Sequence, residues 1–228
     1  MKGVTFMIKL CVFDLDGTLI NSLYDVAKSM NYALKKNKLE QYEIEAYNMF
    51  VGNGMDDLAQ RVVNKATLNE ETQHKVIDDF KKHYISHCYD NTYVYDGCYK
   101  LLTHLELKNI KTAVLSNKPN KLVRKIVRHY FPNYNFLDIR GDLEDYPNKP
   151  NPASLMDLTY KNNIRKNECI YIGDSDIDVL TAQNADVHFC GCEWGFRGFD
   201  ELSNAGAKFI IKQPIDLLKI IDNINQYD

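Results

Sequence analysis

Short apolar runs and amphipathic stretches alternate along the chain from Asp96 onward. Uncharged runs of bulky residues are typical of buried parallel strands, and apolar positions three and four apart are typical of helices. The predicted strands are Thr112–Leu115, Phe136–Ile139, Cys169–Ile172, Val187–Cys190 and Lys208–Ile211. The predicted helices are Cys98–Leu107, Lys121–His129, Ala153–Asn162, Ile177–Asn184 and Pro214 to about Ile224. This alternation predicts an α/β fold with a Rossmann-like parallel sheet.

The chain before Asp96 has a different pattern, in which one strand is followed by helices alone. Leu10–Phe13 is a predicted strand, and the pattern from Asn21 to about Asn91 is helical throughout. Ser22 is expected to cap the first of these helices. The others are predicted at Glu43–Phe50, Met55–Asn64 and Glu70–Tyr89. We therefore expect a sheet core of residues 1–20 and 93–228, with a helical cap subdomain of residues 21–92 inserted after the first strand.

Composition and charge exclude several classes of protein. Of the 228 residues, 45% are hydrophobic and 26% are charged, as is usual for a globular protein. The net charge of -3 and the scattered lysines give no basic surface for nucleic acid, and no run is long enough to span a membrane. The start of the chain has no small-residue cleavage site, so we interpret it as a first strand rather than a signal peptide.

The six cysteines include no Cys-x-x-Cys pair. Cys11 and Cys169 fall inside predicted core strands. We therefore expect reduced, buried thiols in a cytoplasmic protein, and no zinc site.

Polar side chains follow the predicted strands at their carboxyl ends. Asp14 and Asp16 follow the first strand, and the segments Ser116–Pro119, Asn148–Pro152 and Gly173–Asp178 lie at later strand ends or before the next helix. Open α/β sheets bind ligands at this edge, so these segments are expected to meet in one crevice. Two carboxylates one residue apart repel each other unless a cation or a shared proton intervenes, which predicts a hard metal ion such as Mg²⁺.

Each of these residues also has a purely structural interpretation. Ser116 is compatible with a turn or a helix cap, and Lys149 with a solvated loop lysine. The acids from Asp174 to Asp178 are compatible with a charged helix start. Their joint occurrence in this order, each at a strand end, favours a functional site.

These segments resemble the four ordered motifs of the haloacid dehalogenase superfamily. The resemblance is carried by Asp14-Leu15-Asp16-Gly17-Thr18-Leu19, Ser116-Asn117-Lys118-Pro119, Lys149-Pro150 and Gly173-Asp174-Ser175-Asp176-Ile177-Asp178. It spans nearly the whole chain, and the helical insertion after the first motif is similar to that of the phosphoglycolate phosphatase-like group. The stretch Val51–Arg61 is similar to that group's substrate-facing cap segment, although its Gly-Asn-Gly is also simply a turn. The resemblance thus implies Gly54 and Arg61 as substrate contacts.

The resemblance also implies a role for each acid. Asp14 is the expected nucleophile, which forms an aspartyl-phosphate that water then cleaves. Asp16 is the expected general acid and base, which protonates the leaving alcohol and later deprotonates the attacking water. Asp14, the backbone carbonyl of Asp16 and Asp174 are the expected Mg²⁺ ligands, and Asp178 is expected to support them.

By the same resemblance, the phosphoryl group has its own set of contacts. Ser116 and the backbone amide of Asn117 are expected to bind phosphate oxygens. Lys149 is expected to neutralise charge on Asp14 and on the transferring group. The implied activity is Mg²⁺-dependent hydrolysis of a small phosphorylated metabolite, with 2-phosphoglycolate as the first candidate.

Other activities remain as alternatives. The superfamily's dehalogenases lack an acid at the position of Asp16, because a halide leaving group needs no proton. A phosphonatase would need a cap lysine in the site, and the lysines of the first cap helix stand in no recognisable context. A phosphosugar mutase, a pyrophosphatase or a phospho-accepting signalling module stay open.

Two further expectations concern the movement of the cap and the rim of the site. Linkers near Leu19–Ser22 and Thr92–Asp96 are expected to let it open and close over the crevice. Trp194 either lines the rim of the site or packs against the core.

Overall fold

Six parallel strands form the centre of the computed structural model, which describes residues 7–52, 54–64 and 69–227. Their order across the sheet is β5-β4-β1-β6-β7-β8, and all five neighbouring pairs are parallel. The strands are β1 (Leu10–Phe13), β4 (Lys111–Pro119), β5 (Ile139–Asp142), β6 (Cys169–Gly173), β7 (His188–Cys192) and β8 (Ile210–Ile211). The predicted α/β class with a parallel sheet is confirmed.

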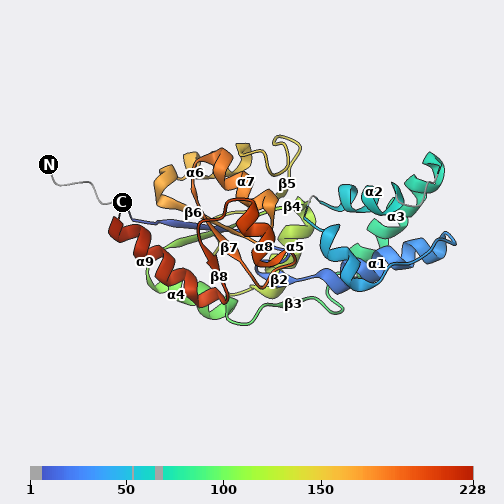
Figure 1. The fold of residues 1–228 in the computed structure, drawn as a ribbon, viewed down its shortest axis with the longest axis horizontal. Helices are drawn as coiled ribbons and strands as arrows, with labels where there is room; N and C mark the ends of the chain where they lie inside the picture. The colour runs from blue at the N-terminus through green and yellow to red at the C-terminus, as the bar shows by residue number, and fades with distance from the viewer. Residues whose placement is uncertain (1–6, 53, 65–68, 228) are drawn as a thin grey trace.

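Helices cover both faces of the sheet (Figure 1). One face carries α4 (Cys98–Leu107), α5 (Asn120–Tyr130) and α9 (Leu217–Tyr227). The other carries α6 (Ala153–Lys161), α7 (Asp176–Ala185) and α8 (Gly198–Asn204). Within β1, Cys11 and Phe13 belong to the first face and Leu10 and Val12 to the second. The strand is a continuous apolar run because both of its faces are covered.

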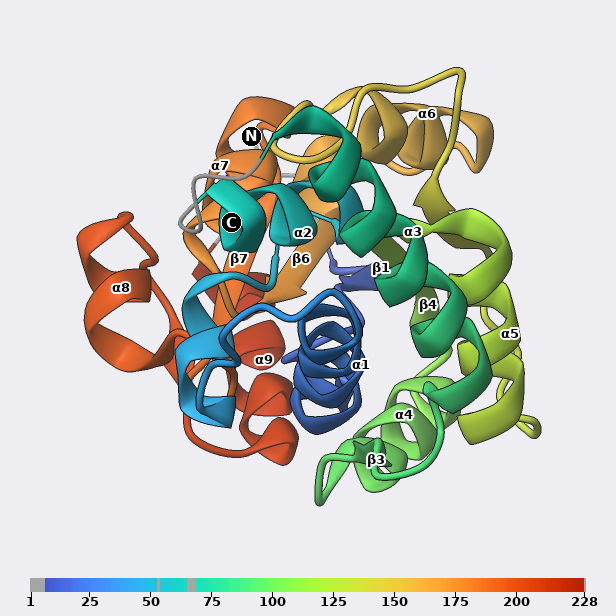
Figure 2. The ribbon, with the colours of Figure 1, turned by 90° about the vertical axis from the view of Figure 1, so that its right-hand side faces the viewer.

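A layer of helices lies in front of the sheet when the molecule is viewed from its cap end (Figure 2). It consists of α1 (Leu23–Lys36), the 3-10 helix η1 (Ile44–Met49), α2 (Met55–Asn64) and α3 (Glu70–His87). α3 packs against both α1 and α2. Buried side chains of this layer, such as Met30, Leu58 and Phe80, share a hydrophobic cluster with Phe13 of β1. The layer therefore rests directly on the core.

Two short strands join the helical layer to the sheet core. β2 (Ile20–Asn21) and β3 (Tyr93–Val94) pair antiparallel, with Ile20 opposite Val94. The chain leaves the core through β2 and returns through β3. They lie beside the predicted cap limits at residues 21 and 92, and the limits themselves stay a prediction.

The structure departs from the sequence-based prediction at several places. β5 begins at Ile139, where the predicted strand Phe136–Ile139 ends. Arg140 continues this edge strand while buried, because Asp138 and Asp157 lie 2.7 and 2.9 Å from its guanidinium nitrogens. The segment predicted as the helix Glu43–Phe50 forms only η1. β2, β3 and α8 had no predicted counterpart.

All six cysteines are buried and carry free thiols, as expected. Burial raises the pKa of Cys190 to about 12, which keeps that thiol protonated and unreactive near neutral pH. Two remaining 3-10 helices, η2 (Lys166–Glu168) and η3 (Pro214–Asp216), lead into β6 and α9. Among the described residues, no helix has the length and apolar character needed to cross a membrane.

Candidate active site

Asp14 is the first residue after β1, at the carboxyl edge of the sheet. Its backbone N–H donates to the Ile172 carbonyl of β6 at 2.8 Å, and its side chain is buried. The chain then turns at Gly17, whose φ of 85° is unfavourable for residues with a side chain. A Cβ at Gly17 would also overlap the carboxylate of Asp174. This glycine therefore lets the loop after β1 approach the loop after β6.

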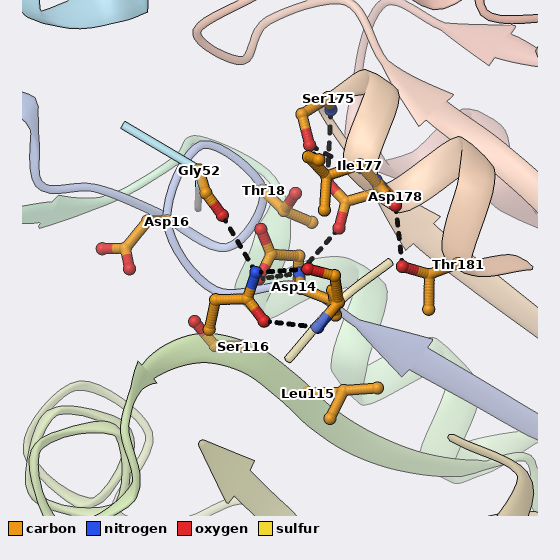
Figure 3. Close-up of polar contacts among 12 residues, drawn as sticks. Asp14, Asp16, Thr18, Gly52, Leu115, Ser116, Ser175, Ile177, Asp178 and Thr181 are labelled. Atoms are coloured by element: carbon orange, nitrogen blue, oxygen red, sulfur yellow. Dashed lines mark hydrogen bonds and ion pairs between the residues drawn. The ribbon is translucent and has the colours of Figure 1, made fainter. Parts of the chain in front are cut away.

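Three buried carboxylates meet at this edge, from Asp14, Asp174 and Asp178. One oxygen of each lies within 4.8 Å of the others, and Figure 3 shows Asp178 close to Asp14. Burial raises the pKa of Asp14 to about 7, an increase that Lys149 opposes and Asp178 supports. Burial, together with Asp178 and Asp14, raises the pKa of Asp174 well above its ordinary value. The cluster therefore favours a bound cation.

Lys149 is the cation that the chain itself supplies to this cluster. Its Nζ lies 2.9 Å from Oδ1 of Asp14 and 2.7 Å from Oδ1 of Asp178, and it donates to the Tyr171 hydroxyl at 3.0 Å. Burial lowers the pKa of Lys149, but Asp14 and Asp178 raise it by more, to well above its ordinary value. The side chain is therefore an ammonium. One ammonium against three carboxylates leaves room for a second, divalent charge.

Asp178 holds the loop after β6 in place. Its Oδ2 accepts hydrogen bonds from the Ser175 hydroxyl at 2.7 Å and from the backbone N–H groups of Asp174 and Ser175, both at 3.2 Å. Ser175 in turn caps α7. Asp174 accepts from the backbone N–H of Phe196 at 2.8 Å and from the Thr18 hydroxyl at 3.4 Å. The loop therefore presents Asp174 in a fixed orientation, and Asp178 acts as its support.

Asp16 lies to the side of Asp14 (Figure 3) and has contacts of its own. Its Oδ1 accepts from Nζ of Lys118 at 2.7 Å and from the hydroxyl of Ser22. Nζ of Lys118 also donates to the Tyr84 hydroxyl of α3 at 2.8 Å. Burial lowers the pKa of Lys118, but Asp16 and Tyr84 raise it by more, so its charge is retained.

Ser22 does not cap α1 through its side chain, although it occupies the N-cap position. The prediction of a capping hydrogen bond is wrong, because the hydroxyl is directed to the Asp16 carboxylate instead. Ser22, whose position is typical of a helix cap, is therefore part of the site.

Ser116 and Asn117, near the carboxyl end of β4, border the same cavity as Asp14. Oδ1 of Asn117 accepts from the backbone N–H of Lys149 at 2.8 Å, and its Nδ2 donates to the Lys149 carbonyl at 3.1 Å. The same Nδ2 lies 3.4 Å from the Gly52 carbonyl of the helical layer. Asn117 thus fixes the segment that carries Lys149 and also contacts the helical layer at Gly52.

A cavity of about 40 Å³ lies between the core and the helical layer. Its core side is polar and is formed by Asp14, Asp16, Ser116, Asn117 and Lys118. Its described cap side is formed by Val26, Val51, Gly52, Gly54, Met55, Leu58 and Phe80. The two acids after β1 and the expected phosphate contacts Ser116 and Asn117 therefore face a largely apolar wall.

Gly54 brings the helical layer close to the backbone of β4. Its φ is 96°, and a Cβ there would lie 2.9 Å from the Asn117 carbonyl oxygen. Both the backbone angle and this approach require glycine. The structure therefore places Gly54 at the cavity, as expected, while its role in binding stays a prediction.

Arg61 and Trp194 have partners outside the described cavity lining. Nε of Arg61 lies 2.6 Å from Oδ2 of Asp57, one turn earlier on α2. The Trp194 indole N–H donates to the Thr18 carbonyl at 3.1 Å. Trp194 also packs against the hydrophobic core cluster, which supports the packing interpretation. Substrate binding by Arg61 stays a prediction.

Three residues at this junction had no predicted role, namely Lys118, Tyr84 and Arg197. Arg197 follows β7, and its guanidinium donates to the Val51 carbonyl of the helical layer at 3.0 Å. The position of Lys118, two residues after Ser116 at the same strand end, is a sequence signal that indicates a place in the site. Tyr84 and Arg197 carry no local signal, because their contacts depend on how the helical layer packs on the core.

The donor set fits a divalent metal ion. Carboxylate oxygens are the ligands that hard cations prefer, and Asp14 and Asp174 present them from two loops. Gly17 and Gly195 both lie so close to Asp174 that a Cβ at either position would overlap it. Both positions therefore require glycine, which indicates a site shaped closely around this carboxylate.

The fold and the site together define a class, an α/β enzyme with buried carboxylates at the carboxyl edge of its sheet beneath a helical layer. More narrowly, the chain belongs to the haloacid dehalogenase-like hydrolase family, whose model matches residues 11–192. This match confirms the resemblance of the four motifs and the expectation that the chain is a hydrolase.

Similar proteins were found among curated sequences and solved structures. A phosphoglycolate phosphatase of Mannheimia succiniciproducens is 30% identical over 219 residues, which cover 93% of this chain and 98% of that protein. A phosphoglycolate phosphatase of Vibrio parahaemolyticus is 28% identical over 219 residues, covering 94% and 96%. The crystal structure of "a predicted phosphoglycolate phosphatase" from Haemophilus somnus has a TM-score of 0.88 at 30% identity, covering 93% and 97%.

Proposed function

We propose that the chain hydrolyses a small phosphate monoester through an aspartyl-phosphate on Asp14, with Mg²⁺ as cofactor and 2-phosphoglycolate as the first candidate substrate. It is a phosphoric monoester hydrolase, in keeping with its family and with the relatives named above. The observation that carries the proposal is that Asp14 and Asp16 border one small cavity with Ser116, Asn117 and Lys118. A nucleophile, a proton donor and groups that bind phosphate are therefore available to the same ester.

The first step transfers the phosphoryl group to the enzyme. A carboxylate oxygen of Asp14 forms a bond to phosphorus, and the bond from phosphorus to the ester oxygen breaks. Asp16, in its protonated form, gives its proton to the departing oxygen, so an alcohol leaves rather than an alkoxide. Because phosphate monoesters hydrolyse very slowly in water, this step needs most of the stabilisation that the site can supply.

The second step releases phosphate. A water molecule attacks the phosphorus of the aspartyl-phosphate while Asp16, now a carboxylate, accepts its proton. The bond between phosphorus and Asp14 breaks, which restores the Asp14 carboxylate and the protonated Asp16. Each proton that leaves Asp16 in the first step is thus replaced in the second.

Charge on the transferring group is balanced by the surrounding residues. Lys149, at 2.9 Å from Oδ1 of Asp14, is placed to stabilise negative charge as the new bond forms. Ser116 and the Asn117 amide bind phosphate oxygens in this proposal. Mg²⁺ would be held by Asp14, the backbone carbonyl of Asp16 and Asp174, and would neutralise phosphate charge.

The size of the cavity between the cap and the core, about 40 Å³, supports a small leaving group. In this proposal residues 21–92 act as the cap, which moves on the linkers near β2 and β3 and excludes bulk water when closed. The leaving alcohol then contacts the cap wall, where Gly54 and Arg61 are the proposed cap contacts. The buried free thiols support a location in the reducing cytoplasm.

A panel of phosphorylated metabolites, assayed for free phosphate with Mg²⁺ and again with EDTA, tests the proposal. We expect Mg²⁺-dependent phosphate release, with 2-phosphoglycolate among the best substrates. Isomerised product with little free phosphate would instead indicate a mutase. A stable aspartyl-phosphate without turnover would indicate a signalling module, and activity confined to inorganic pyrophosphate would indicate a pyrophosphatase.

A further inference from the structure

Two donors from different parts of the chain meet on one oxygen of Asp16. Nζ of Lys118 lies 2.7 Å from Oδ1, and the Ser22 hydroxyl donates to the same atom. No described residue donates to Oδ2. These contacts therefore fix the carboxyl group by one oxygen and leave the other available on the side of the cavity that Asp16 borders.

Lys118 is itself held by the helical layer. Its Nζ donates to the Tyr84 hydroxyl at 2.8 Å and lies 5.0 Å from the centre of the Tyr84 ring. Tyr84 belongs to α3 of the helical layer and Lys118 to β4 of the core, so the contact crosses between them. Both side chains are buried, where an ammonium N–H without a partner is costly. The position of Lys118 therefore depends on where α3 lies.

We propose that Tyr84 is a positioning residue for Asp16, because its hydroxyl holds Lys118 against Oδ1 when the cap lies over the core. The inference rests on the proposed function, since that function gives Asp16 the proton-transfer step. A cap that is displaced removes the Tyr84 hydroxyl from Lys118 and loosens Asp16. Closure of the cap therefore aligns the proton donor at the same time as it excludes water from the substrate.

Loss of this alignment affects substrates unequally. The alcohol of a phosphate monoester needs a proton as its bond to phosphorus breaks, whereas the acetate that leaves acetyl phosphate does not. Acetyl phosphate is also small, which suits the cavity. A substitution that merely perturbs the fold lowers kcat/KM for both substrates. One that misplaces Asp16 lowers kcat/KM for the monoester alone, because kcat/KM reports the transfer that expels the leaving group and not the second step that both substrates share.

The test is the substitution Tyr84→Phe, which removes the hydroxyl and keeps the ring. We expect kcat/KM with 2-phosphoglycolate, or with the best monoester of the metabolite panel, to fall about tenfold, as a lost hydrogen bond to a charged group would cause. With acetyl phosphate, kcat/KM should change by less than about twofold. Equal losses with the two substrates, or no loss with the monoester, would overturn the proposal.

Tyr47→Phe is the matched control. Tyr47 is also a fully buried tyrosine of the helical layer, and its hydroxyl donates to Oδ1 of Asn31 at 2.7 Å, within that layer. The substitution removes a buried hydroxyl without touching Lys118. We expect it to leave the ratio of the two kcat/KM values as in the wild-type protein, and a changed ratio would show that the effect is not specific to Tyr84.

A second measurement keeps this inference separate from the proposed function. If the wild-type protein hydrolyses neither compound, the proposed function has failed before Tyr84 is tested. A crystal structure of the Tyr84→Phe variant then examines the positioning directly. Displacement of Lys118 from Oδ1 of Asp16 is expected, and an unchanged contact overturns the inference.

Discussion

The ammonium nitrogen of Lys149 lies 2.9 Å from Oδ1 of Asp14. This one contact places a positive charge against the proposed nucleophile inside a buried cluster of carboxylates. The same nitrogen lies 2.7 Å from Oδ1 of Asp178, so Lys149 joins the loop after β1 to the start of α7. The stability of the site and its chemistry therefore depend on the same side chain.

Replacement of Lys149 by methionine should leave buried carboxylates without their cation. We expect the metal-free protein to lose about 3–5 kcal/mol of unfolding free energy, as when one partner of a buried ion pair is removed. Phosphatase activity should fall by about 10²–10³ or more, because charge stabilisation is lost in the transition state. Chemical denaturation and steady-state kinetics measure the two effects.

Lys166→Met provides the control for this change. Lys166 forms an ion pair of 3.5 Å with Asp186, and both side chains are more than half exposed. Its removal should change the unfolding free energy by less than about 1 kcal/mol. A comparable loss in the two variants would contradict the importance given to the Lys149 contact.

The stability of the metal-free protein should depend on pH through Asp14. Burial raises the pKa of Asp14 from 3.8 to about 7, so the folded protein binds this proton more tightly than the unfolded chain does. The contribution is present below the unfolded value and is lost as pH rises towards about 7. We therefore expect the unfolding free energy to decrease between about pH 4 and about pH 7 through this group.

Denaturation curves over that pH range, with and without Mg²⁺, measure this effect. The substitution Asp14→Asn cannot lose the proton, so it should flatten this part of the pH dependence in the metal-free protein. Mg²⁺ competes with the proton, so its affinity for the wild-type protein should increase as pH rises through about 7. If the unfolding free energy of the Asp14→Asn variant depends on pH as that of the wild-type protein does, the assignment of this effect to Asp14 is refuted.

The closeness of Gly17 to Asp174 can be tested against a glycine of similar backbone angle. Gly17 has φ 85° and its Cβ would overlap Asp174, whereas Gly198 has φ 72° and open space around it. Gly198→Ala should cost about 1–2 kcal/mol from the backbone alone. Gly17→Ala should cost more and should also weaken Mg²⁺ binding, as measured by calorimetry. Equal effects on metal affinity would show that crowding of Asp174 is unimportant.

The approach of the cap to Asn117 makes a similar prediction for Gly54. A Cβ at Gly54 would lie 2.9 Å from the Asn117 carbonyl, while one at Gly52 would come no closer than 3.8 Å to Arg197, its nearest neighbour. Both glycines have positive φ, so both alanine variants carry backbone strain. Gly54→Ala should lower kcat/KM by about tenfold more than Gly52→Ala, because it also blocks the closed position of the cap. The two variants are compared by steady-state kinetics, and equal values would argue against closure at this point.

Most of the sheet and the acids at its carboxyl edge could be predicted, because the sequence patterns that indicate them are local. β1 and the helices Met55–Asn64 and Cys98–Leu107 have the predicted limits, since apolar periodicity marks them directly. Asp14 and Asp174 lie together because parallel strands place their carboxyl ends at one edge. Arg140 shows the limit of this reasoning. A charged residue suggests the end of a strand unless its distant partners are known.

The contacts between cap and core could not be predicted in the same way. Tyr84 at helical spacing is typical of packing, and nothing near it in the sequence indicates that Lys118 will be its partner. Ser22 has the residue type and the position of a helix cap, yet its hydroxyl donates to the Asp16 carboxylate instead of capping α1. Such contacts depend on how the helical layer packs on the sheet core, which the local sequence pattern does not encode.

The central claim is that Asp14 carries the phosphoryl group during turnover. Acid quenching of the enzyme during steady-state hydrolysis of its monoester substrate with Mg²⁺, followed by peptide mass spectrometry, tests this claim most directly. We predict a phosphoryl group on the peptide that contains Asp14, together with loss of both the adduct and phosphate release in the Asp14→Asn variant. Sustained phosphate release by that variant, or a phosphoryl group found on another residue of the wild-type enzyme, would contradict it.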